Sequence, residues 1–146
     1  YEMIITGQAG QTSQVTYRQP SVTHNFRRPD TYRIALTTSV VRNGNTLSAT
    51  TEKTVRAINL APLANFSFTR DLGNVTFTST STEPNAPDDF ITNYTWNFGD
   101  ANPPQSGSTL ANVLHTYTRS GTYIVELTVT DNFGLSSSKK DTLEIK

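Results

Sequence analysis

The side chains best suited to acid or base chemistry near neutral pH are the two histidines of this 146-residue chain, His24 and His115. A catalytic histidine needs a nucleophile or a second imidazole to work with, and the sequence supplies neither beside these residues. The chain has no cysteine, which excludes thiolate chemistry, and no Gly-x-Ser-x-Gly, His-Glu-x-x-His or phosphate-loop pattern. We therefore expect structural histidines and no catalysis.

Large aromatic side chains occupy alternate positions in Tyr94, Trp96 and Phe98. Aromatic faces stack on sugar rings, so a carbohydrate platform is one interpretation of Tyr94 and Trp96. Alternate residues of a strand point to the same face, however, which places three large rings on one side of a single strand. We predict that this face belongs to a hydrophobic core.

Carboxylates flank this strand, with Asp88 and Asp89 just before it and Asp100 just after it. Calcium takes roughly six to eight oxygen ligands, and loop carboxylates with backbone carbonyls can supply them. The other interpretation is that these acids are solvated turn formers, with Asp100 bonded within its own turn. The residues alone leave both interpretations open.

The elements that position these residues are predicted to be strands, because threonine is abundant, good helix formers are sparse and no helical pattern is convincing. In the first part of the chain we expect strands near residues 1–6, 14–18, 21–26, 31–42 and 46–58. In the second part we expect strands through residues 64–68, 75–77, 91–98, 113–117 and 123–129, and a last strand ending at 145. Short strands with closely spaced turns predict an all-β, immunoglobulin-like sandwich of two antiparallel sheets.

A long hairpin is predicted in the first part, with Asn43-Gly44-Asn45 as its turn. The inward side chains of this hairpin should be those of Tyr32, Ile34, Leu36 and Val40, with Val55 opposite them.

The run from Tyr94 to Asp100, followed by His115-Thr116-Tyr117 and Gly121-Thr122-Tyr123, resembles the PKD (polycystic kidney disease) domain family over about residues 62 to 146. The resemblance implies a non-catalytic sandwich with the aromatic run as its core strand, and Tyr123 is similar to the tyrosine corner of such domains. The core residues expected on this basis are Tyr94, Trp96, Phe98, His115, Tyr117, Tyr123, Val125 and Leu127.

The same resemblance bears on the carboxylates, because the loops that hold Asp88, Asp89 and Asp100 correspond to calcium-binding loops in some family members, notably those attached to bacterial collagenases. The loop from Glu83 to Asp89 departs from the family's more usual Asp-x-Asp-Gly. Calcium is therefore the one cofactor for which the sequence offers candidate ligands.

An internal repeat at an offset of 91 residues changes the interpretation of the first part. Residues 22–26 match residues 113–117, and residues 31–37 match residues 122–128, so that Tyr32 repeats the role of Tyr123. We expect two tandem modules, residues 1–60 and 61–146, joined by a short proline-containing connection. The first lacks the N-terminal strands of the second, and we expect a cut through a domain, or strands donated from elsewhere.

Charge is balanced overall but unevenly placed. Residues 1–61 carry seven Lys or Arg against three Asp or Glu (+4), and residues 62–146 carry five against nine (−4). This asymmetry indicates either head-to-tail attraction between copies or chance variation. Neutral total charge argues against nucleic acid as a partner, despite Arg27, Arg28 and Arg33, and no apolar run is long enough for a membrane helix.

The resemblance to the PKD family implies a non-catalytic module of a larger cell-surface or secreted protein. A rigid sandwich with a stiff connection is expected to act as a spacer and as a surface for protein contact or adhesion. Two other functions stay open: assembly of a virion or surface appendage, and substrate binding as an accessory module of a secreted hydrolase. Expected partners are proteins or polysaccharides at a cell or virion surface, and neighbouring repeats. The sequence begins at Tyr1 with no leader, so we expect a piece of a longer protein.

Overall fold

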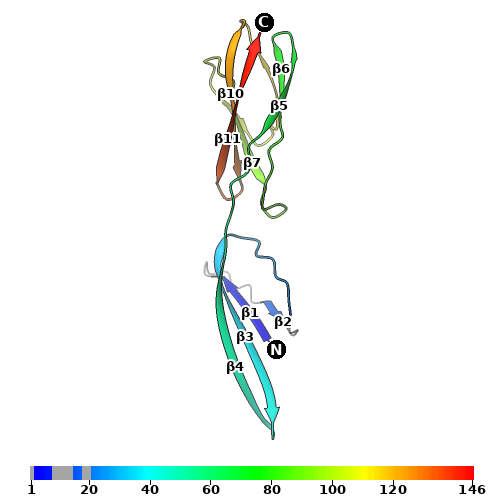
Figure 1. The fold of residues 1–146 in the computed structure, drawn as a ribbon, viewed down its shortest axis with the longest axis vertical. Helices are drawn as coiled ribbons and strands as arrows, with labels where there is room; N and C mark the ends of the chain where they lie inside the picture. Colours follow the sequence, from blue (N-terminus) through cyan, green and yellow to red (C-terminus); the bar gives the residue numbers. More distant parts are fainter. Residues whose placement is uncertain (1, 8–14, 18–20) are drawn as a thin grey trace. The chain divides into compact units, whose positions relative to one another are not determined.

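The computed structural model describes residues 2–7, 15–17 and 21–146, and every helix-or-strand element in them is a β-strand. The predicted all-β class is therefore confirmed. The chain divides into two compact units, Tyr1–Asn59 and Leu60–Lys146 (Figure 1). Within the described ranges, no helix of a length and apolarity suited to crossing a membrane is found.

The second unit is a β-sandwich of two antiparallel sheets. The three-stranded sheet has the order β5-β6-β9, formed by β5 (Phe66–Asp71), β6 (Asn74–Ser79) and β9 (Asn112–Thr116). The four-stranded sheet has the order β11-β10-β7-β8, formed by β11 (Ser136–Ile145), β10 (Gly121–Asp131), β7 (Ile91–Asn97) and β8 (Gln105–Gly107). In Figure 1 these strands run from green (β5 and β6) to red (β11).

The core of the second unit lies between its two sheets, because each strand turns its apolar residues to the same side. Along β10, for example, Val125, Leu127 and Val129 are buried while the residues between them are partly exposed. The hydrophobic core consists of Phe66, Val75, Phe77, Trp96, Phe98, Val113, Tyr117, Val125, Leu127, Val129, Leu143 and Ile145.

The predicted aromatic face is part of this core. Trp96 is fully buried, with its ring centroid 5.2 Å from that of Phe66 and 5.5 Å from that of Phe77. Its indole Nε1 donates a hydrogen bond of 2.8 Å to the backbone carbonyl of Leu110. Tyr94 is only half-buried and packs against the edge of the core. The placement of Trp96 argues against its use as a sugar-stacking surface.

The first unit contains one four-stranded antiparallel sheet in the order β2-β1-β3-β4. Its strands are β1 (Glu2–Gly7), β2 (Val15–Tyr17), β3 (Asp30–Arg42) and β4 (Asn45–Ala57). The predicted hairpin joins β3 to β4, with Asn43 at φ 52° and Gly44 at φ 76°. Positive φ at both central residues is the requirement of the tight hairpin turn that Asn-Gly favours.

Two expectations for the first unit are wrong. Residues 21–26 form no strand, and Val40 is 59% exposed rather than inward. The pairing of β1 with β3 extends from Gly7 opposite Tyr32 to Glu2 opposite Thr37. Val40 lies beyond that last pair, where β1 no longer runs beside β3. No strand of the described part of the chain covers the apolar side chains of the hairpin there.

The other inward predictions for the hairpin agree better with the structure. Tyr32, Ile34 and Leu36 are half-buried, and Val55 lies directly opposite Tyr32 in the β3–β4 register. Among Ile4 and residues 21–59, for which the structure describes burial, none is fully buried. The predicted inward residues of β3 are therefore partly covered, but so are Ala35 and Thr37 beside them, and burial along this strand does not alternate.

Candidate functional site

His115 and Asp100 form a closely bonded polar pair in the second unit. Nε2 of His115 lies 2.7 Å from Oδ2 of Asp100, and both side chains are largely buried. The imidazole stacks on Phe98 at 3.9 Å between ring centroids and meets the ring of Tyr117 edge-on at 4.8 Å. The pair joins the end of β9 to the turn after β7.

The local sequence explains why Asp100 reaches His115. Gly99 has φ 74°, and a Cβ atom built there would lie 2.4 Å from the carbonyl oxygen of Ile124. Only glycine fits this close approach, so the chain turns sharply after β7 and directs Asp100 back across the sheet. Asp100 also accepts hydrogen bonds from the backbone N and from Nδ2 of Asn102, at 3.3 and 2.8 Å.

The carboxylate of Asp100 is held in its charged form. Burial by itself raises the pKa of Asp100, but hydrogen bonds from His115 and Asn102 outweigh it, and the pKa lies below its ordinary value. Tyr117 beside it donates a hydrogen bond of 2.9 Å to the carbonyl of Phe98, and burial raises the pKa of its phenol. Both groups are committed to bonds within the fold.

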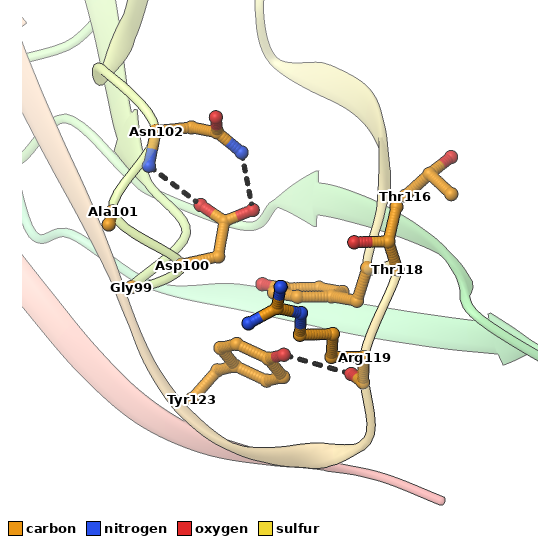
Figure 2. A pocket seen from close by; sticks show the side chains of 9 residues that line it. Gly99, Asp100, Ala101, Asn102, Thr116, Thr118, Arg119 and Tyr123 are labelled. Atoms are coloured by element: carbon orange, nitrogen blue, oxygen red, sulfur yellow. Dashed lines mark hydrogen bonds between the residues drawn. The ribbon is translucent and has the colours of Figure 1, made fainter.

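An open hollow of about 520 Å³ lies beside Asp100, between the turn of residues 99–102 and the segment of residues 116–119. Arg119 and Tyr123 both line this hollow, and the hydroxyl of Tyr123 donates a hydrogen bond of 2.8 Å to the backbone carbonyl of Arg119 (Figure 2). This bond is the tyrosine corner that the sequence predicted for Tyr123. The hollow is polar and open, and the Asp100 oxygens that face it already accept hydrogen bonds from Asn102 (Figure 2).

A second group of carboxylates lies at the other end of β7. It comprises Asp88, Asp89, Asp131 and Glu83, which repel one another. Asp89 and Asp131 are buried. Because β7 has seven residues at about 3.3 Å each, a distance of roughly 20 Å separates Asp89 from Asp100. The three acids considered together as calcium ligands thus divide between two sites, and Asp100 belongs to the His115 pair.

The acid group is electrostatically strained. Burial raises the pKa of Asp89, and the neighbouring carboxylates of Asp131 and Asp88 raise it further. Burial also raises the pKa of Glu83, against a backbone hydrogen bond from Asn85, with Asp131 and Asp89 adding to the increase. Negative charge at this end of the sandwich is therefore unfavourable unless a cation balances it.

Two members of this group were not singled out from the sequence. Glu83 lies in the loop from Glu83 to Asp89, and Asp131 lies at the end of β10, where the chain turns toward β11. A register shift between β7 and β10 occurs at Asp131, whose Oδ1 accepts from the backbone N of Phe133 and of Leu135 at 2.8 and 2.9 Å. The polar loop and the turn meet only in the tertiary structure.

The donors of this group suit calcium, which the family resemblance suggested. Oε2 of Glu83 is buried and has no hydrogen-bond partner among the described residues, as expected of a ligand oxygen. Across the part of the chain that the structure describes, no three His, Cys, Asp or Glu side chains converge as a formed metal site. The carboxylate oxygens are of the type that calcium prefers, but these acids are not arranged as a formed coordination site.

Comparisons with known proteins agree with this fold. Residues 59–146 match the model of the PKD domain family. The chain is similar to collagenase ColA of Bacillus cereus, at 43% identity over 56 residues, which is 38% of this chain and 5% of ColA. It is also similar to the pre-pro-metalloprotease PrtV of Vibrio cholerae, at 26% identity over 144 residues, which is 99% of this chain and 15% of PrtV. The chain thus spans only a small part of either relative.

Solved structures are also similar to this chain. The PKD1 domain of Vibrio anguillarum Epp has a TM-score of 0.54 and 31% identity, covering 61% of this chain and 98% of that one. A structure of carbohydrate-binding modules from the β-sandwich superfamily has a TM-score of 0.54 and 35% identity, covering 62% of this chain and 36% of that one. With the sandwich topology and the family match over residues 59–146, the chain belongs to the PKD domain family.

Proposed function

We propose that this chain is a non-catalytic accessory part of a larger extracellular protein, which spaces its neighbours and contacts protein or polysaccharide. The observation that carries the proposal is the state of the polar groups in the second unit. The groups best suited to catalysis, Asp100 and His115, are bonded to each other and buried against Phe98. They stabilise a sandwich and leave no free base facing the hollow.

The relatives support the extracellular and accessory part of the proposal. Two of them are a collagenase and a metalloprotease, of which this chain matches a small share, and one similar structure contains carbohydrate-binding modules. A module of this kind increases the local concentration of a neighbouring domain at its polymer substrate. We favour this role over assembly of a virion, which no observation on the described residues supports.

The surface best suited to a polymer lies beside the acid group. Phe90 is 56% exposed and Phe133 is 38% exposed. The backbone N of Phe90 donates to Oδ1 of Asn132 and its carbonyl accepts from the backbone N of Asn132, both at 3.0 Å, so the two phenyl-bearing segments are adjacent. Exposed rings on two adjacent segments suit stacking on sugars or on proline-rich peptide.

The test is retention of the 146-residue chain on insoluble collagen and on insoluble chitin, with Phe90→Ala and Phe133→Ala as variants. We expect retention that falls at least about fivefold in each variant, since each ring contributes about 1 kcal/mol or more of stacking. Leu72→Ala is the matched control, because Leu72 is 90% exposed on the β5–β6 turn. Retention on neither polymer, with head-to-tail self-association that high salt removes, would overturn the proposal in favour of assembly.

We also propose that calcium binds the acid group of the second unit, through Glu83, Asp88, Asp89 and Asp131 and without Asp100. The raised pKa values of Glu83 and Asp89 and the buried, unpartnered Oε2 of Glu83 support this assignment. A bound calcium ion would supply positive charge that neutralises the repelling carboxylates. The residues themselves would anchor the loop of residues 83–89 to the turn that follows β10.

A further inference from the structure

The hollow beside Asp100 holds two groups of opposite charge in its lining, Asp100 and Arg119 (Figure 2). Oδ2 of Asp100 accepts hydrogen bonds from His115 and from the side chain of Asn102. In the described part of the chain, Oδ1 accepts a single bond, from the backbone N of Asn102 at 3.3 Å. A carboxylate oxygen has two lone pairs, so Oδ1 can accept from a further donor.

Arg119 brings donors to the same hollow. Its backbone carbonyl accepts from Tyr123, but its guanidinium has neither an ion pair nor a hydrogen bond within residues 2–7, 15–17 and 21–146. The hydroxyl of Thr118, also in the lining, has no hydrogen-bond partner in the same residues. A guanidinium carries five N–H donors, and a hydroxyl both donates and accepts. The hollow therefore has donors and acceptors that the fold itself does not use.

An aromatic ring lies beside these polar groups. Tyr123 is half-buried and lines the hollow. Its hydroxyl is bonded to the carbonyl of Arg119, and its ring centroid lies 4.3 Å from that of Tyr117. These contacts fix the ring before any ligand arrives, which lowers the entropy lost on binding. A fixed ring with donors and acceptors around it suits the face and the hydroxyls of a sugar.

We propose that this hollow is a subsite for one unit of a neutral polysaccharide. The sugar packs on the ring of Tyr123, Arg119 and Thr118 donate to its oxygens, and Oδ1 of Asp100 accepts from one of its hydroxyls. The subsite serves the polysaccharide contact proposed above, on which its assignment rests, and narrows that contact to neutral sugars. Its volume of about 520 Å³ lies within the range of roughly 300–1,000 Å³ that small-molecule sites occupy.

Charge disfavours other ligands. Burial by itself raises the pKa of Asp100, but hydrogen bonds from His115 and Asn102 hold it below its ordinary value, so this carboxylate is charged at neutral pH. A charged Asp100 repels an acidic sugar, as does the net charge of residues 62–146, five Lys or Arg against nine Asp or Glu (−4). Arg119 repels a cationic sugar. A neutral hydroxyl can accept from Arg119 or donate to Asp100, so it suits both charges.

A peptide is a poorer occupant than a sugar. The lining is mostly polar, and the ring of Tyr123 is its main apolar surface. Peptide-binding grooves depend on apolar pockets for alternate side chains, which this hollow does not supply. Phe90 lies before β7 and Asp100 after it, so binding at the exposed phenyl rings and binding in the hollow affect different ends of this strand.

The test is an NMR titration of the isotope-labelled 146-residue chain with cellotriose and, separately, with triacetylchitotriose. Each sugar is added to about 20 mM, because a single subsite of this kind is expected to bind in the millimolar range. We expect at least one of the two sugars to give saturating shifts at the backbone amides of residues 99–102 and 116–119. Trigalacturonic acid should bind there at least about threefold more weakly, because Asp100 repels it.

Three variants test the assigned groups. Arg119→Ala should weaken binding at least about fivefold, because it removes charge-assisted hydrogen bonds, and Thr118→Val about twofold. Neither side chain has a partner in the described residues, so both variants should fold as the unmodified chain does. Arg28→Ala is the matched control. Arg28 is also exposed, and its carbonyl accepts from the hydroxyl of Tyr32 at 2.9 Å, so this variant removes the same charge from a similar corner and should bind unchanged.

The outcomes separate this subsite from the function proposed above. Shifts confined to residue 90 and residues 132–133 would overturn the subsite and leave the polysaccharide contact standing. Shifts at neither place would overturn both. Equal affinity of Arg119→Ala and the unmodified chain would overturn the role of Arg119 and with it the subsite. Saturating shifts in the hollow with a proline-rich, collagen-like peptide and with neither sugar would also overturn it, because the occupant is then a peptide.

Discussion

Trp96 shows how one side chain can join the two sheets of a domain. Its ring contacts Phe66 and Phe77 from the opposite sheet, and its indole nitrogen donates to Leu110. Trp96→Ala removes these contacts and leaves the Leu110 carbonyl without this donor, so we expect a loss of about 3–5 kcal/mol in the free energy of unfolding. Urea unfolding measures it, with exposed Phe133→Ala as control, and a loss under about 1 kcal/mol would contradict the role given to Trp96.

Asp100 should make stability depend on pH. Its pKa is lowered in the folded chain, so it adds stability above its unfolded pKa of about 4, and this contribution is lost as pH falls through the folded value. We expect the unmodified chain to be more stable than Asp100→Asn at about pH 7 and the difference to shrink by about pH 3. Urea unfolding at the two pH values measures this, and an equal difference at both would show that Asp100 acts through shape alone.

At the scale of elements, the turn after β7 depends on a glycine for two reasons. Gly99 has positive φ, and an added Cβ would meet the carbonyl oxygen of Ile124. Gly134 also has positive φ, at 87°, but an added Cβ there meets nothing within 4 Å. We expect Gly134→Ala to cost about 1 kcal/mol and Gly99→Ala at least about 2 kcal/mol, measured by thermal unfolding. Equal costs would mean that the contact with Ile124 relaxes freely.

The loop and turn that hold the acid group should respond to calcium. The raised pKa values of Glu83 and Asp89 mean that these groups disfavour folding as pH rises through their folded values, and a cation reverses this by screening them. We expect the midpoint of thermal unfolding to rise by several degrees in about 1 mM calcium relative to chelator. The increase should vanish in Glu83→Gln and persist in Asp100→Asn. If the calcium-dependent increase were lost only in Asp100→Asn, the ion would bind beside Asp100 and not at the acid group.

At the scale of the whole molecule, the two units should unfold separately. The second unit has a closed core, whereas none of residues 21–59 of the first is fully buried. We expect an early, broad transition from the first unit and a later, cooperative one from residues 60–146. Calorimetry of the 146-residue chain and of a version beginning at Leu60 measures both. A later transition that is lost in the shorter version would contradict independent units.

Much of the second unit could be predicted because its information is local. Strand periodicity placed Trp96, Val125 and Leu127 inward, and all three are buried. The Asn43-Gly44 turn was equally local, since it depends on which residues tolerate positive φ. Errors arose where a strand depends on its neighbours. Val40 continues an inward pattern, but it extends past the end of β1 and nothing covers it.

The candidate site shows the same division. The amino-acid sequence by itself determined which residues have the chemistry, namely His115, the acids around β7 and the aromatic run, and in which strands or loops they lie. Only the tertiary structure decided which of them meet. It paired Asp100 with His115, and it brought Asp131 from a turn distant in sequence to Glu83 and Asp89. Periodicity specifies the side of a strand on which a residue lies, whereas contact between loops depends on strand order and register, which the packing of the two sheets selects.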